Sequence, residues 1–281
     1  MYYLMWFVTR VLGLIPIFIL DCVARFLAFF AFDILRVRRS LILKNISIAF
    51  PSLSNGEKVR MGRASFYHFV VTLLETMLGG PQNMLANITF ENPELMDQAM
   101  AKNKGVYLTC IHSGNFEVLG AAISTRWRPV TVPVKFVGKG GFDRYIHEQR
   151  QRYHIVPVRN VKRGDGYRAI RDALTEGRPV GFMLDQARPG EPRLPLFGHP
   201  AKTNTSLAAI WRRQRSSLLP LLVIRERFGV HRIKFYPEVE LSVTDDLEKD
   251  IVDHSILFNK IVELLVRDAP AQYWWIHNRW K

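Results

Sequence analysis

The sequence predicts an α/β protein, with a mixed and mostly parallel sheet flanked by helices and an apolar, membrane-associated helix at its N-terminus. Short apolar stretches alternate with segments of helical periodicity between residues 105 and 240, an order typical of strands joined by crossover helices. Residues 2–35 are mostly apolar and aromatic, and 281 residues suffice for a large core. We therefore expect a membrane anchor at residues 1–36 and one α/β domain at residues 37–281.

The N-terminal segment has no charge-free run long enough to be a simple transmembrane helix. Its longest such run, residues 11–20, is shorter than the roughly 20 residues that span a bilayer, and Pro16 interrupts it. Two arrangements remain open: an oblique or imperfect span in which Asp21 pairs with Arg25, or an amphipathic helix in the interface. A pair of buried core helices is the alternative without a membrane.

Four basic residues follow this segment directly: Arg36, Arg38, Arg39 and Lys44. They favour the membrane interpretation and predict that the rest of the chain lies on the cytoplasmic side.

Two helices are expected between the anchor and the sheet. The first is a basic amphipathic helix at residues 38–46. The second is a long helix at residues 57–78, with Ser54 as a candidate cap and a Gly-Gly-Pro sequence after its end. Glu75, near the end of the long helix, is expected to be a surface or capping carboxylate.

The sheet is expected to begin with a short strand at residues 88–90. Further strands are expected at residues 105–111, 130–136, 155–158, 179–184, 218–225 and 232–240. Helices are expected at residues 92–101, 116–125, 141–153, 167–176, 205–215 and 247–267. No G-x4-G-K-[ST] motif is present and no G-x-G-x-x-G follows a strand, so the sequence does not support a nucleotide site.

The main candidate for a functional site is the sequence HSGNFE at residues 112–117. It places His112 at the exit of a buried strand, Asn115 at the N-cap of the next helix and Glu117 in that helix's first turn. Ligands of open α/β sheets bind at this end of the strands. His112 is therefore a candidate general base, with Glu117 as the carboxylate that orients it. The alternative is a surface histidine beside an unrelated acidic residue.

Two other strand exits carry a charged residue. Arg159 follows one strand, where a guanidinium can bind a phosphate or an oxyanion, or can simply face solvent. Asp185 follows another strand and precedes a long loop with an apolar centre, which indicates a lid or a wall for an apolar ligand. A role for Asp185 in anchoring that loop is an equal alternative.

The net charge of the chain also narrows the range of possible partners. A net charge of +14 indicates an anionic partner, which can be nucleic acid, an anionic bilayer or an acidic protein. The only two cysteines, Cys22 and Cys110, both lie in apolar stretches. A disulfide framework and a zinc site are therefore not expected.

The sequence HSGNFE resembles the H-x4-[DE] motif of the lysophospholipid acyltransferase superfamily. Other features resemble one branch of it, the bacterial lipid A biosynthesis acyltransferases, which are lauroyl and myristoyl transferases of the inner membrane. These features are the apolar N-terminus, the IAFP sequence at residues 48–51, Arg159-Asn160, Leu184-Asp185-Gln186, Leu196-Phe197-Gly198 with Thr203, and the ending at residues 272–281. The resemblance covers essentially the whole chain.

The resemblance implies transfer of a fatty acyl chain from acyl carrier protein, or from coenzyme A, to a hydroxyl of a membrane glycolipid. It agrees with His112 as general base and Glu117 as its orienting group. Arg159, Asp185 and Asn115 are the candidate substrate-binding residues, with a purely capping role as the alternative for Asn115. No metal or other cofactor is implied.

The expected partners are acyl carrier protein, an anionic glycolipid acceptor such as a lipid A precursor, and the inner membrane, with the catalytic domain on its cytoplasmic face and no nucleic acid. An aminolipid or a lysophospholipid is an alternative acceptor. A non-enzymatic basic protein that binds membranes or nucleic acid is the alternative of another class.

Overall fold

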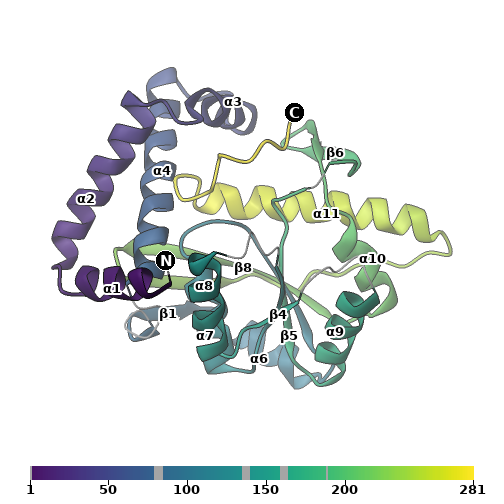
Figure 1. The fold of residues 1–281 in the computed structure, drawn as a ribbon. Helices are drawn as coiled ribbons and strands as arrows, with labels where there is room; N and C mark the ends of the chain where they lie inside the picture. The colour runs from purple at the N-terminus through teal and green to yellow at the C-terminus, as the bar shows by residue number, and fades with distance from the viewer. Residues whose placement is uncertain (1, 79–84, 135–139, 159–163, 188) are drawn as a thin grey trace.

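The computed structural model describes residues 2–78, 85–134, 140–158, 164–187 and 189–281 (Figure 1). Its centre is a seven-stranded sheet with the strand order β1-β9-β8-β2-β5-β3-β4. The strands are β1 (Ile88–Glu91), β2 (Val106–Cys110), β3 (Thr131–Pro133), β4 (Val156–Val158), β5 (Pro179–Met183), β8 (Ser217–Arg227) and β9 (Val230–Phe235). Among the described strands of this seven-stranded sheet, only β8 and β9 pair in antiparallel orientation, which confirms the predicted mixed and mostly parallel sheet.

Strand β2 lies in the middle of the sheet, and all five of its residues are buried. Its side chains alternate between two apolar cores, one on each face, as the pleat of a strand requires. Tyr107 packs with buried residues of α9 (Gly164–Thr175), α10 (Ser206–Arg213) and α11 (Leu247–Asp268). Leu108 packs on the other face with residues of α6 (Glu94–Ala101) and α7 (Phe116–Arg126). Helix α8 (Gly141–Arg152) leads into β4.

The N-terminal segment forms two helices in place of the single helix that the sequence suggested. Helix α1 (Tyr2–Gly13) ends before Pro16, and α2 (Ile17–Phe29) begins after it and continues into the π-helical turn η1 (Phe30–Ile34). A proline has no N–H with which to continue the hydrogen bonds of a preceding helix. The predicted pair of Asp21 and Arg25 is present, with 2.8 Å between Oδ2 and Nε.

Much of the apolar surface of these two helices is exposed. Leu14 is 84% exposed and Phe18 is 70% exposed, whereas Leu20 and Ala24 pack against α4 (Asn55–Met77). Within the described residues, no single helix has both the length and the apolar composition needed to cross a bilayer. The segments Trp6–Gly13 and Ile17–Ile34 meet these length and composition criteria when they are taken together, but the chain bends by 116° between them.

The expected helices between anchor and sheet are α3 (Arg39–Ala49) and α4. Ser54 begins α4 with a capping box, in which its hydroxyl accepts from the N–H of Glu57 and its N–H donates to the Glu57 carboxylate. In Figure 1, α4 stands between α2 and the sheet.

The loop that was expected to form a lid contains an antiparallel hairpin, β6 (Arg193–Leu196) and β7 (His199–Lys202). Both turn residues have positive φ, 51° at Phe197 and 74° at Gly198, as a two-residue hairpin turn demands.

Candidate active site

His112 and Asp185 meet at the exits of two neighbouring strands. β2 and β5 run parallel, and Cys110 pairs in register with Met183. The residues two positions further along each strand are His112 and Asp185, so the register alone brings them side by side. The backbone N–H of His112 donates to Oδ2 of Asp185 at 3.0 Å, and Nδ1 of His112 lies 2.8 Å from Oδ1.

The Asp185 carboxylate is fully buried and still ionised. Burial favours the neutral form, but the electrostatic interaction with His112 and the hydrogen bonds from its ring and backbone outweigh that effect and lower the pKa of Asp185 to about 2. An ionised carboxylate beside Nδ1 holds the proton of the imidazole on that nitrogen. The other nitrogen, Nε2, then carries a lone pair and can act as a base.

The imidazole of His112 is partly exposed, with 13% of its side-chain surface accessible. Nε2 of Gln186, an exposed residue, lies 3.1 Å from Nε2 of His112 and 3.0 Å from Nε2 of His277. The two hydrogens of one amide nitrogen can serve both lone pairs. The Gln186 amide therefore occupies the position beside Nε2 of His112 that a substrate hydroxyl needs in order to donate its proton.

Aromatic rings form a wall beside the imidazole. The ring centroids of Phe116 and Trp274 lie 5.0 and 5.4 Å from that of His112, and Phe69 packs edge-on against Trp274 at 4.8 Å. This wall makes one side of the site apolar, which suits a hydrocarbon substrate.

The C-terminal tail, residues 269–281, carries Trp274 of this wall, and hydrogen bonds to its backbone hold it in place. The N–H of Trp274 donates to the carbonyl of His112 at 2.9 Å. The amide of Asn45, buried on α3, donates to the carbonyls of Trp275 and His277, both at 2.8 Å. Figure 1 shows the tail passing between α3 and the β6–β7 hairpin.

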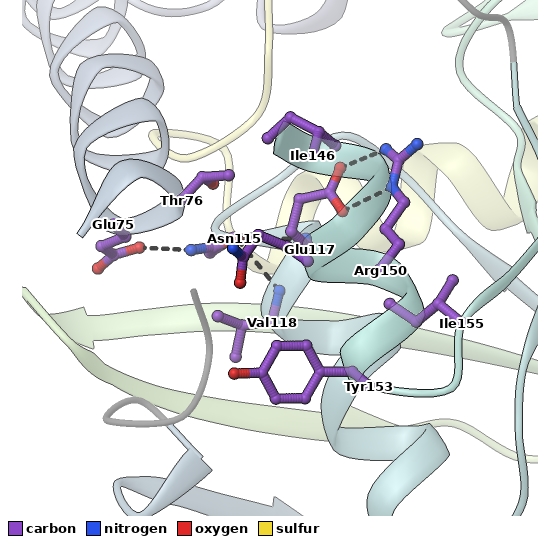
Figure 2. A pocket seen from close by; sticks show the side chains of 10 residues that line it. Glu75, Thr76, Asn115, Glu117, Val118, Ile146, Arg150, Tyr153 and Ile155 are labelled. Atoms are coloured by element: carbon purple, nitrogen blue, oxygen red, sulfur yellow. Dashed lines mark hydrogen bonds and ion pairs between the residues drawn. The ribbon is translucent and has the colours of Figure 1, made fainter. Parts of the chain in front are cut away.

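Glu117 does not hold His112, which corrects the expectation from the sequence. Its carboxylate faces Arg150 of α8 and accepts two hydrogen bonds, from Nε at 3.0 Å and from Nη2 at 2.5 Å (Figure 2). Both carboxylate oxygens are thus engaged by the guanidinium. Together with Gln149 and Tyr153, this pair lines a cavity of about 20 Å³, which is room for about one water molecule.

The comparison with known proteins decides the family. The whole chain, residues 1–281, matches the family described as bacterial lipid A biosynthesis acyltransferase. The chain belongs to this family.

Relatives from Escherichia coli (strain K12) are named for different acyl chains. The chain is 26% identical over 291 residues to the lipid A biosynthesis palmitoleoyltransferase, which covers 100% of this chain and 92% of that protein. It is 24% identical over 247 residues to the myristoyltransferase, an alignment that covers 85% of this chain and 73% of that protein. It is 25% identical over 261 residues to the lauroyltransferase, which covers 89% of this chain and 81% of that protein. These similarities support an acyltransferase of lipid A biosynthesis and do not distinguish between chain lengths.

In this acyltransferase, Asn115 has a structural position, which corrects its expected contact with substrate. Its side chain is fully buried, and Oδ1 caps α7 by accepting from the N–H groups of Glu117 and Val118 at 3.2 Å. Its Nδ2 donates to Oε2 of Glu75 at 2.9 Å (Figure 2). Asp185 is likewise turned to His112 and is not exposed to a ligand.

Glu75 is buried, whereas the sequence suggested a surface carboxylate. Its two oxygens accept from Nε and Nη2 of Arg225 at 3.0 and 2.6 Å, and Oε1 also accepts from the N–H of Gly229 at 2.9 Å. Burial raises the pKa of Glu75, but the charge and hydrogen bonds of Arg225 outweigh this effect and lower it. Thr72 extends the network, because it accepts from Arg225 and donates to the carbonyl of Gly114.

This buried network supports the turn that carries the HSGNFE sequence. Gly114 has φ +52°, and a Cβ at that position would lie 2.6 Å from the carbonyl oxygen of Val223, so only glycine fits there. The sequence contained one sign of the network, a glutamate and an arginine that each follow a mostly apolar stretch, residues 69–74 and 218–224.

Arg159, the remaining predicted site residue, lies outside the described residues, directly after the end of β4. The residues that sequence reasoning did not assign to the site are Gln186, Trp274, His277 and the Glu75–Arg225 pair. Gln186 and His277 stand within sequences that carried the family resemblance, and that was the available signal.

Proposed function

We propose that the protein transfers a fatty acyl chain from the thioester of acyl carrier protein, or of coenzyme A, to a hydroxyl of a lipid A precursor. The observation that carries this proposal is the partly exposed imidazole of His112, which the ionised Asp185 holds at Nδ1. Family membership supplies the class of reaction.

In the proposed mechanism, Nε2 of His112 takes the proton of the acceptor hydroxyl as its oxygen attacks the thioester carbonyl. The tetrahedral intermediate then collapses, the C–S bond breaks, and the imidazolium returns its proton to the leaving thiolate. Asp185 stabilises the imidazolium that forms between these steps. General-base catalysis of this kind contributes about 10²–10⁴-fold to the rate. Gln186 must move aside for the hydroxyl to reach Nε2.

The predicted role of Arg159 belongs to the same proposal. Its guanidinium would bind an anionic group, either a phosphate of the acceptor or the oxyanion of the intermediate.

The exposed apolar surface of α1 and α2 supports a location at the inner membrane. Tyr3, Phe7, Leu14 and Phe18 are each at least 65% exposed, and a concentration of exposed apolar side chains is typical of a membrane or protein contact. The net charge of +14 favours both anionic lipids and an acidic carrier protein. The domain that follows α2 would lie on the cytoplasmic face.

A reconstituted assay tests the proposal. Purified full-length protein is given lauroyl, myristoyl or palmitoleoyl thioesters of acyl carrier protein or coenzyme A, together with a lipid A precursor, an aminolipid or a lysophospholipid. The products are identified by mass spectrometry. We expect acylation of the lipid A precursor, abolished in His112→Ala. Acylation of another acceptor alone, or undiminished transfer by His112→Ala, would contradict the proposal.

A further inference from the structure

A groove separate from the catalytic site lies between α2, α4 and the end of β8. It has a volume of about 790 Å³. None of its lining residues is among those that surround His112. One wall is apolar, formed by Ile17 and Phe18 of α2, which are 56% and 70% exposed.

The groove is also basic. Five arginines line it: Arg25, Arg60, Arg63, Arg225 and Arg227. The two acidic residues that line it are already engaged by other groups. Asp21 is bound by Arg25 and by the hydroxyl of Tyr67, and Glu226 is bound by Arg232. The groove therefore has an excess of positive charge.

Arg60 and Arg227 are the cations available to a ligand. Both are exposed, and neither forms an ion pair with any residue in the described part of the chain. Arg25 and Arg63 are held by Asp21 and Asp33, and Arg225 is held by Glu75. Guanidinium groups favour phosphate because their planar donors match its oxygens.

We propose that this groove binds an anionic phospholipid of the membrane. The phosphate would lie against Arg60 and Arg227, and the acyl chains would run along Ile17 and Phe18. A phospholipid fits because the groove combines uncompensated positive charge with exposed apolar side chains. The inference rests on the proposed membrane placement of α1 and α2, and it does not depend on the acyl-transfer chemistry.

Vesicle flotation of the full-length protein tests the site. The vesicles contain phosphatidylcholine alone or a mixture of phosphatidylcholine with phosphatidylglycerol. Each arginine beside an anionic surface contributes about fivefold to binding. We therefore expect Arg60→Gln/Arg227→Gln to lose on the order of twentyfold in affinity for the mixed vesicles and to bind phosphatidylcholine vesicles like the wild type.

A charge-matched control separates a site from general attraction. Arg213→Gln/Arg215→Gln removes the same two charges from exposed positions at the end of α10. We expect it to change binding little, because charges more than about 10 Å from the surface are screened. Equal losses in the two double variants would overturn the proposal, since the attraction would then be diffuse.

Binding of a soluble lipid gives an independent readout. Dihexanoyl phosphatidylglycerol, below its micellar concentration, should bind the wild type and the control variant but not Arg60→Gln/Arg227→Gln. Unchanged melting temperatures of the variants would show that the loss is not due to unfolding. If the wild type floats with vesicles but binds dihexanoyl phosphatidylglycerol no better than dihexanoyl phosphatidylcholine, the proposed phospholipid site is wrong and the membrane placement still holds. Wild-type protein that floats with neither kind of vesicle would overturn both the site and the membrane placement.

Discussion

Nδ1 of His112 lies 2.8 Å from Oδ1 of Asp185, although 73 residues separate them in the chain. The contact follows from the pairing of β2 with β5, which aligns Cys110 with Met183. The fully buried carboxylate also accepts the backbone N–H of His112. The pair therefore fixes both the position and the tautomer of the imidazole.

Asp185→Asn should greatly slow the proposed acyl transfer with little unfolding. A neutral amide can donate to Nδ1, which would move the imidazole proton to Nε2 and remove the base. We expect kcat to fall on the order of 10²–10⁴-fold, with a smaller change in KM. Steady-state kinetics with the acyl thioester measures both constants. Asp165→Asn is the matched control, because the Asp165 side chain is 93% exposed. Equal kinetics of Asp185→Asn and this control would contradict the assigned role.

Glu117 and Arg150 should behave as one unit. Two hydrogen bonds join them, so removing either residue abolishes both bonds. We expect Glu117→Gln and Arg150→Gln to lower kcat by similar factors and the double variant to be no worse than either single one. A double-mutant cycle of kcat measures this coupling. If Glu117 oriented His112 instead, Arg150→Gln would keep its activity and the coupling would be absent.

Removing one member of the buried Glu75–Arg225 pair should destabilise the protein strongly. Glu75→Ala or Arg225→Met leaves an uncompensated charge in the interior, which costs about 3–5 kcal/mol. Glu75→Leu/Arg225→Met removes both charges, and we expect it to cost less than the sum of the single changes. Urea unfolding in detergent, followed by circular dichroism, measures these differences.

The control for that experiment is the exposed pair Lys102–Glu238, whose side chains are 52% and 37% exposed. Its removal should have little effect on the free energy of unfolding. Similar losses at the two pairs would contradict the structural importance of Glu75.

Lowering the pH should reduce the free energy of unfolding through protonation of Asp185. The pKa of this carboxyl is lowered from 3.8 to about 2 in the folded protein, so the unfolded chain takes up the proton first as the pH falls. The stabilisation is complete above the unfolded pKa and disappears as the pH passes through the folded pKa. It corresponds to about 2 kcal/mol.

The measurement is the free energy of unfolding of the wild type and of Asp185→Asn between pH 7 and pH 2. Other carboxylates are common to both proteins and cancel in the difference. We expect the pH-dependent part of this difference to vanish at the acid end of the range. A difference independent of pH would show that Asp185 does not carry this stabilisation.

The sequence by itself determined the local features of this protein. The apolar stretch before His112 predicted the buried strand β2. Asn115 predicted the start of α7, and Ser54 predicted the start of α4. Each of these signals lies within a few residues of the structure that it specifies, because strand alternation, helix periodicity and caps are local properties.

Only the tertiary structure decided which side chains meet. The carboxylate that holds His112 comes from a neighbouring strand and not from the next turn of the chain, and 150 residues separate Glu75 from Arg225. These contacts depend on the order of strands in the sheet and on the path of the C-terminal tail. No local pattern encodes either, because strand order is settled when distant apolar faces pack together. The sequence therefore located the histidine, and the packing of the sheet selected its partner.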